Sequence, residues 1–342
     1  MPSERRTWAR LEHAARQPAR PGARSSLSSS IVPTGTIELR LTGDAAREGW
    51  LQPFAGGLLW CDRPVGRGGS RAPAPSAGVA PSSSGFALVY DGPGLVAGGM
   101  QRIRSFVAAD GTRKVEFEDG ETFLIAAAGD RIARLVATAA EAPAQRTLER
   151  ALGAPMALAL ALRGIFLLHA SALAGPRGVI AICGESGTGK STLASAAASW
   201  RDLGLSRVAD DQLPVALGAR PTVLPHFPQL KLPPEAWHAP GAAAVLPLRM
   251  VVQALRSAPA GGDSAPPARI EPLRAAQACL FLAGATVAAR LFDRQLLTRH
   301  LEACAAASES LYVCRLRYAS GLDRLREPLA ALAASLARLD GS

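Results

Sequence analysis

Apolar and polar positions alternate over short runs between about Gly35 and Ala140, which is typical of strands joined by tight turns. Runs such as "TIELRLTGD", "GFALVYDGPG" and "VAADGTRKVEFEDGETFLIAAAGD" carry this two-residue period. The tripeptides "ADG" and "EDG" inside the last run predict hairpin turns. The stretch Ser70–Gly85 is rich in Pro, Ser and Gly and predicts a long loop. The pattern therefore predicts a β-rich N-terminal domain over residues 34–140.

A different pattern follows, in which helical and strand-like segments alternate along the chain. The stretch Ala144–Gly164 predicts a helix, and "GVIAIC" at Gly178–Cys183 predicts a short buried strand. An Ala-rich helix is predicted over Ser191–Trp200, followed by the strand-like run "SRVADD". The C-terminus is rich in Ala and Leu and is predicted to be helical, with one strand-like run, "SLYVCRLRY". This alternation predicts an α/β domain over residues 141–342, with a central sheet flanked by helices.

The length of the chain agrees with two domains. It has 342 residues, of which 48% are hydrophobic, enough to bury a sizeable core. Residues 1–33 carry six arginines among Pro and Ser and lack the apolar core of a secretory signal. They are predicted to form a disordered basic tail.

Charge and cysteine content exclude several classes of protein. The formal net charge is +10, but only 5% of residues are aromatic and no nucleic-acid-binding motif accompanies the charge. The most apolar segment is interrupted by Arg163 and His169, so no membrane span is expected. The five cysteines form no C-x-x-C pair, which favours a reducing cytoplasm. We therefore expect no nucleic-acid or membrane partner; the sequence leaves the oligomeric state open.

One lysine stands out because the chain holds only three, Lys114, Lys190 and Lys231, among 38 basic residues. Gly184, Gly189, Lys190 and Ser191 fit the pattern G-x-x-x-x-G-K-[ST]. In a loop of this form, backbone N–H groups surround phosphates, the lysine reaches the β- and γ-phosphates, and the hydroxyl binds Mg²⁺. A compact ammonium does this in a way that a planar guanidinium does not.

The sequence around this motif is the one that a phosphate-binding loop requires, namely a buried strand before it and a helix after it. The start of that helix would present unpaired N–H donors to phosphates. We therefore expect ATP and Mg²⁺ as cofactors. The predicted nucleotide-binding residues are Gly184, Glu185, Ser186, Gly187, Thr188, Gly189, Lys190, Ser191 and Thr192.

Two adjacent carboxylates, Asp210 and Asp211, end a strand-like run about twenty residues after Lys190. Two carboxylates at the end of a strand can divide the work of phosphoryl transfer, one near the metal and one as proton acceptor. An acidic surface turn would give the same letters. The phosphate-binding motif upstream favours the catalytic interpretation.

Three pieces together resemble the HPr kinase/phosphorylase-like proteins: "LHASAL" with His169, the loop "GESGTGKST", and "VADD". His169 lies fifteen residues before Gly184, as in that family. The runs "FPQLKLPPEAW" and "YVCRLRYASGLDRL" look like the branch of the family associated with lasso-peptide biosynthesis. The E-x-R-G segment of true HPr kinase/phosphorylases is not evident after the aspartates, which argues against phosphorylase activity and against HPr as the substrate.

The resemblance implies roles for individual residues. Asp210 is expected to be the general base for the attacking serine hydroxyl, and Asp211 the second acidic partner, near the metal with Ser191. His169 is expected to orient an aspartate or the loop, and Lys231 to contact a phosphate or a substrate carboxylate. Three other histidines, His226, His238 and His300, have no partner at metal-ligand spacing.

The expected function is a P-loop kinase that phosphorylates a serine of a peptide partner, at the terminus of a lasso precursor. Two alternatives stay open on the sequence. One is a small-molecule kinase that uses the same loop, and the other is a non-catalytic nucleotide-binding switch. The tandem aspartate favours an enzyme over a switch.

Overall fold

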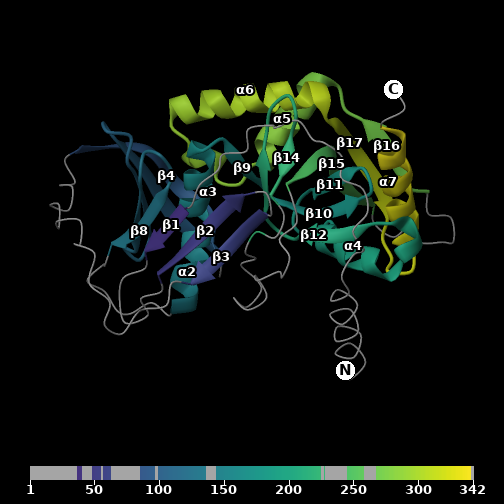
Figure 1. The fold of residues 1–342 in the computed structure, drawn as a ribbon, viewed down its shortest axis with the longest axis horizontal. Coiled ribbons are helices and arrows are strands. Elements are labelled where there is room, and N and C mark those ends of the chain that lie inside the picture. The colour runs from purple at the N-terminus through teal and green to yellow at the C-terminus, as the bar shows by residue number, and fades with distance from the viewer. Residues whose placement is uncertain are drawn as a thin grey trace.

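The computed structural model describes residues 37–40, 48–54, 57–62, 85–96, 99–135, 144–224, 227, 245–257 and 267–339. These residues form two β-sheets with helices beside them, so the mixed α/β class predicted from the sequence is confirmed (Figure 1). The predicted tail over residues 1–33 and the predicted loop over residues 70–84 lie outside the described residues.

The first sheet contains eight strands in the order β3-β2-β1-β8-β7-β6-β5-β4. Its neighbours pair antiparallel, except for β1 and β8, which pair in parallel. The strands are β1 (Ile37–Arg40), β2 (Glu48–Phe54), β3 (Gly57–Asp62), β4 (Phe86–Val96), β5 (Gly99–Ala108), β6 (Arg113–Phe117), β7 (Thr122–Ile125) and β8 (Arg131–Leu135). The hairpin turns predicted at "ADG" and "EDG" join β5 to β6 and β6 to β7, as expected.

The second sheet contains nine strands in the order β12-β10-β11-β15-β14-β13-β9, with β17 beside β15 and β16 beside β17. The strands are β9 (Ile165–Leu168), β10 (Ala170–Gly175), β11 (Gly178–Cys183), β12 (Ser206–Ala209), β13 (Leu213–Ala216), β14 (Thr222–Val223), β15 (Leu246–Ser257), β16 (Arg269–Pro272) and β17 (Tyr312–Ala319). The predicted strand at Gly178–Cys183 is observed with the same bounds and is buried along its whole length.

The helices are α2 (Ala144–Leu152), α3 (Ala154–Leu162), α4 (Lys190–Ala196), α5 (Ala275–Ala285), α6 (Arg294–Ser310) and α7 (Arg326–Arg338). One face of the second sheet shares a core with α5 and α6, through Ala278, Leu282, Cys304 and Ala307. The other face shares a core with α4 and α7. The expected arrangement of a sheet between helices is therefore present.

Two helix predictions need correction. The single helix predicted over Ala144–Gly164 is split into α2 and α3, because the chain turns at Gly153 and Pro155 opens the second helix. The helix predicted over Ser191–Trp200 ends at Ala196 and continues as short 3₁₀ turns at Ala197–Ser199 and Arg201–Leu203. Alanine favours a helix in isolation, and tertiary packing has shortened this one.

The first sheet is joined to the rest of the chain by an apolar core and by ion pairs. Buried side chains of the sheet, such as Phe123 and Ile132, pack with α3, with β9 and with Phe292 and Leu296 near the start of α6. Arg113 of β6 forms an ion pair with Asp293, whose carboxylate also caps α6 by accepting from the Leu296 amide. Helices that the sequence assigned to the second domain thus pack on the first sheet. The boundary predicted near residue 140 falls among residues 136–143, outside the described part.

Among the described residues, none of the helices combines the length and the apolar character needed to cross a bilayer.

Candidate active site

Three of the sequence-predicted pieces meet at one edge of the second sheet. Strand β10 pairs antiparallel with both β11 and β12, so β11 and β12 point the same way, and β15 runs parallel to β11. The loop Gly184–Gly189 follows the end of β11, Asp210 and Asp211 follow the end of β12, and His169 directly precedes β10. This edge, outside the carboxyl ends of parallel strands, is where open α/β sheets bind ligands.

Lys190 is folded back over the loop that it follows. Its Nζ donates to the carbonyl oxygens of Gly184 at 2.8 Å and Glu185 at 3.0 Å, and its side chain is buried, with 7% exposed. The Thr188 hydroxyl donates to the same Glu185 carbonyl at 2.8 Å. Because the carbonyl and N–H of a peptide unit point in opposite directions, bonds that hold the loop carbonyls also fix the directions of the loop amides. Such a set of amides binds anions.

Glycine is required where the loop turns into α4. Gly189 has φ of 92°, in the left-handed region that side chains rarely adopt. The next loop glycine back, Gly187, also has positive φ, at 83°. These glycines therefore allow the backbone conformation that a phosphate-binding loop requires.

Asp210 is held by a serine that the sequence reasoning did not single out. The Ser171 hydroxyl, fully buried on β10, donates to Asp210 Oδ1 at 2.7 Å. Ser171 lies opposite Ile182 of β11, on the sheet face that α4 covers, so this hydrogen bond fixes the Asp210 carboxylate on the side of the loop and α4.

Arg207 links Asp210 to α4. Its guanidinium donates to the Ser195 hydroxyl at 3.1 Å and lies 3.7 Å from Asp210 Oδ2. Ser191 stands four residues before Ser195, on the same face of α4 and one turn nearer the loop. Ser191 and Asp210 therefore lie at the same end of the sheet.

Asp211 and His169 form the second half of this cluster. His169 Nδ1 lies 3.1 Å from the Asp211 carbonyl oxygen and 3.7 Å from Asp211 Oδ1. Asp211 has φ of 71°, a left-handed conformation that an aspartate tolerates better than most residues. The turn at Asp211 sends the two adjacent carboxylates to different partners, Asp210 to Ser171 and Asp211 to His169.

The nearest thiol takes no part in this chemistry. Cys183 is the last residue of β11, and burial raises the pKa of its thiol to about 12, against the opposing effect of Lys190. The group stays protonated at neutral pH and packs as an apolar side chain. Cys183, Cys279, Cys304 and Cys314 are free thiols.

The residues at this edge suit Mg²⁺ and ATP. Hydroxyl and carboxylate oxygens of Ser191, Asp210 and Asp211 are donors that Mg²⁺ prefers, and Mg²⁺ sites typically combine one or two carboxylates with substrate phosphates. In the described part of the chain, no cluster of three or more His, Cys, Asp or Glu side chains is arranged to hold a metal alone. Ser191, Asp210 and Asp211 would hold such a metal together with phosphates of a nucleotide.

Other sequence candidates are not brought to this edge. Lys231, His226 and His238 lie outside the described residues. His300 is buried on α6, with its Nε2 2.9 Å from the Thr286 hydroxyl, and packs against Phe166 and Phe292. Its environment is that of a core residue.

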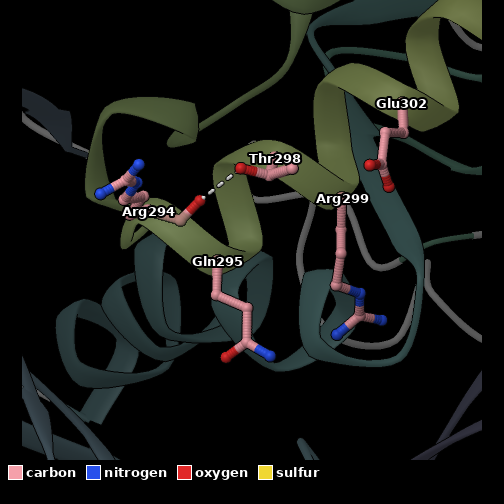
Figure 2. Close-up of a pocket in the computed structure, with 5 residues that line it drawn as sticks. All are labelled: Arg294, Gln295, Thr298, Arg299 and Glu302. Atoms are coloured by element: carbon pink, nitrogen blue, oxygen red, sulfur yellow. Dashed lines mark hydrogen bonds between the residues drawn. The ribbon is translucent and has the colours of Figure 1, made fainter.

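A surface hollow of about 500 Å³ lies elsewhere, along α6. Figure 2 shows its lining residues, all on this one helix: Arg294, Gln295, Thr298, Arg299 and Glu302. All five are exposed, and the Thr298 hydroxyl donates to the Arg294 carbonyl oxygen of its own helix. A face of a single helix lacks the convergent walls of a catalytic site, and none of the predicted site residues belongs to it.

The structure adds residues that the sequence reasoning missed. Ser171 and Arg207 contact Asp210, and the Tyr318 hydroxyl of β17 donates to the Thr188 carbonyl oxygen of the loop. Ser171 lies within "LHASAL" and Arg207 within "SRVADD", so their nearness to the motifs was a usable signal. Tyr318 lies 130 residues from Thr188, and no local pattern could have indicated its contact.

No protein-family model matches the chain, and no curated protein matches it. Among solved structures, it is similar to the Hpr(Ser) kinase/phosphatase from Coxiella burnetii, at 14% sequence identity over 50% of this chain and 97% of that chain, with a TM-score of 0.27. A likeness of this size carries no argument about activity, so the inferences below depend on the residues of this chain.

Proposed function

We propose that this protein is an ATP- and Mg²⁺-dependent kinase that transfers the γ-phosphate to a serine hydroxyl of a peptide. One observation carries the proposal: the loop Gly184–Gly189 with Lys190 and the carboxylates of Asp210 and Asp211 lie at the same edge of one sheet. A phosphate-binding loop alone indicates a nucleotide, and a carboxylate beside it supplies a proton acceptor for transfer.

Each residue has a role in this proposal. The loop amides and Lys190 bind the phosphates, and Ser191 with Asp211 binds the metal. Asp210 is the general base, oriented by the Ser171 hydroxyl and held on the α4 side of the sheet. His169 orients Asp211. Lys231 is proposed to contact the substrate. When bound, ATP supplies the phosphoryl group and Mg²⁺ neutralises charge on its oxygens.

Transfer of the phosphoryl group to the serine hydroxyl releases one proton. The serine oxygen forms a bond to the γ-phosphorus while the bond from that phosphorus to the bridging oxygen of ADP breaks. The hydroxyl proton passes to the Asp210 carboxylate, and the products are phosphoserine, ADP and, after release from the carboxylate, one proton. Lys190 and the loop amides stabilise the charge on the phosphoryl oxygens as they move.

The proposed acceptor is the terminal serine of a lasso precursor peptide, in the cytoplasm. Two features support it: the resemblance of "FPQLKLPPEAW" and "YVCRLRYASGLDRL" to kinases of that branch, and the net charge of +10. A basic protein attracts the carboxylate of a peptide terminus, and this attraction weakens as salt rises.

The test is to incubate the protein with Mg-ATP and, separately, a serine-ended precursor peptide, its Ser→Ala form, free HPr, and a panel of hydroxylated metabolites. Mass spectrometry then detects the gain of one phosphate. We expect the serine-ended peptide to gain it, at a rate that falls from low to high salt. The Lys190→Ala protein is the negative control.

Three outcomes would contradict the peptide assignment: phosphate on HPr alone, phosphate on the Ser→Ala peptide as readily as on the parent, or phosphate on a metabolite alone. The last leaves a small-molecule kinase on the same loop. ATP binding with no transfer to any acceptor would reject the enzyme and leave the nucleotide-binding switch.

A further inference from the structure

Tyr318 joins the phosphate-binding loop to a strand that lies far away in the sequence. It stands near the end of β17, with only 3% of its surface exposed, and its hydroxyl donates to the carbonyl oxygen of Thr188. Burial raises the pKa of Tyr318, although nearby Arg256 opposes this effect. The hydroxyl therefore keeps its proton at neutral pH and remains a hydrogen-bond donor.

This bond fixes the direction of one loop amide. The carbonyl of Thr188 and the N–H of Gly189 belong to the same peptide unit, and none of the described peptide bonds is cis. In a trans unit these two groups point in opposite directions. When the Thr188 carbonyl is held against Tyr318, the Gly189 N–H points away from β17, among the loop amides available to an anion.

The packing at Gly189 shows how closely the loop and Tyr318 fit. A Cβ atom placed on Gly189 would lie 2.7 Å from the Tyr318 hydroxyl oxygen, closer than such contacts occur. The loop backbone therefore rests directly on the tyrosine, and any larger residue at position 189 would have to displace it.

We propose that Tyr318 is a positioning residue of the phosphate site, which aims the Gly189 N–H at a bound phosphate by holding the Thr188 carbonyl. The inference rests on the proposed nucleotide-binding function and deepens it. A single neutral hydrogen bond contributes modestly in a folded protein, so its removal is expected to weaken phosphate binding about five- to tenfold rather than abolish it.

The experiment compares Tyr318→Phe with Tyr312→Phe. Tyr312 begins the same strand and lies about 20 Å away along it, so its variant controls for the loss of a tyrosine hydroxyl from β17. Calorimetry measures the Kd for Mg-ATP and for inorganic tripolyphosphate. We expect Tyr318→Phe to weaken both by the same factor, because the change acts on phosphates alone, and Tyr312→Phe to change neither by more than about twofold. Thermal denaturation of both variants shows whether either change acts through stability.

Gly189→Ala, alone and combined with Tyr318→Phe, tests the contact directly. The alanine variant is expected to bind tripolyphosphate much more weakly, since its methyl group meets the tyrosine hydroxyl. Removing that hydroxyl relieves the contact, so the double variant should lose less affinity than the product of the two single losses. The positive φ at position 189 leaves part of the loss in place.

Two results would overturn the inference while leaving the nucleotide site intact: tripolyphosphate binding to Tyr318→Phe as tight as to the unmodified protein, or fully multiplicative losses in the double variant. If the unmodified protein binds neither Mg-ATP nor tripolyphosphate, both the proposed function and this inference are wrong.

Discussion

Two clusters of charged and polar residues in this protein are built in opposite ways. In the first, which we call the Arg150 cluster, Arg150 of α2 is 1% exposed and donates to Asp119 at 2.9 Å, Glu121 at 2.7 Å and Gln101 at 2.7 Å. Its guanidinium also lies 4.7 Å from the centre of the Phe117 ring. In the second, the aspartate cluster at the sheet edge, Asp210, Asp211 and His169 are all partly exposed.

The difference in burial distinguishes residues that stabilise the fold from residues whose polar atoms a ligand can reach. Burial raises the pKa of Asp119, but hydrogen bonds from Arg150 and from the Glu121 amide outweigh it, so its pKa lies below the usual value. The Arg150 cluster is thus paired within the protein and fastens α2 to the first sheet. The aspartate cluster lies at the sheet edge where the loop Gly184–Gly189 also lies. Changes in the first should cost stability, and changes in the second should cost activity.

The largest expected effect is on stability. Arg150→Ala removes a buried guanidinium from Asp119, Glu121 and Gln101 and leaves Arg134 as the remaining cation beside Glu121, so we expect the free energy of unfolding to fall by about 3–5 kcal/mol. Arg146→Ala is the matched control, because Arg146 contacts the same Asp119 from an exposed position and should cost less than about 1 kcal/mol. Denaturant unfolding measures both. Equal costs would mean that burial of Arg150 is not what stabilises the cluster.

The next effect is on phosphoryl transfer. Lys190→Ala should slow transfer about 10²–10³-fold with the fold intact, because it removes the ammonium that acts on phosphate charge and the bonds that hold the Gly184 and Glu185 carbonyls. Lys190→Arg should also fail, since a planar cation does not fit a loop that surrounds a compact one. Lys114→Ala is the control, as Lys114 pairs with Glu116 on the first sheet. Full activity in Lys190→Ala would reject the loop assignment.

Asp210→Asn is expected to lower turnover about a hundredfold while ATP affinity changes less than about twofold. Single-turnover rates and equilibrium binding separate these two quantities. Asp202→Asn is the control, because Asp202 pairs with Arg326 at the surface. A normal rate in Asp210→Asn together with a slow one in Asp211→Asn would transfer the base role to Asp211.

The local features of this site were predictable from the sequence because they depend on neighbours along the chain. The strand at Gly178–Cys183, the loop after it and the two carboxylates after β12 all follow from short patterns. The predicted strand-like run ended in Asp210 and Asp211, and the observed strand ends before both of them, at Ala209. Whether His169, Lys190 and Asp210 act together in catalysis stays a prediction.

What the sequence did not reveal depends on pairing between distant segments. Gly153 and Pro155 could have indicated the break between α2 and α3, but the long apolar run suggested one helix. The contacts of Tyr318 with the loop and of Arg150 with Asp119 and Glu121 require the strand and helix order to be known first. Side chains that position a site or attach a helix through such long-range contacts produce no periodic pattern in the sequence.

The smallest expected effect concerns His300, which belongs to neither cluster. It tests whether burial of a single imidazole makes the stability of the protein depend on pH. Burial lowers the pKa of His300, whose ring packs against Phe166 and Phe292 and whose Nε2 faces the Thr286 hydroxyl and the Cys304 thiol. Burial raises the pKa of that thiol to about 12, so Cys304 stays neutral in the same pH range.

The folded protein therefore resists protonation of His300, while the unfolded chain takes up a proton near pH 6.5. The stability due to the neutral imidazole is complete above about pH 6.5 and is lost as the pH falls from there toward the lowered value of the folded state. Between pH 7.5 and 5.5, the melting temperature of the unmodified protein should fall by about one to three degrees more than that of His300→Asn, which cannot take up this proton. Equal decreases in the two proteins would show that His300 is not the group whose protonation destabilises the fold.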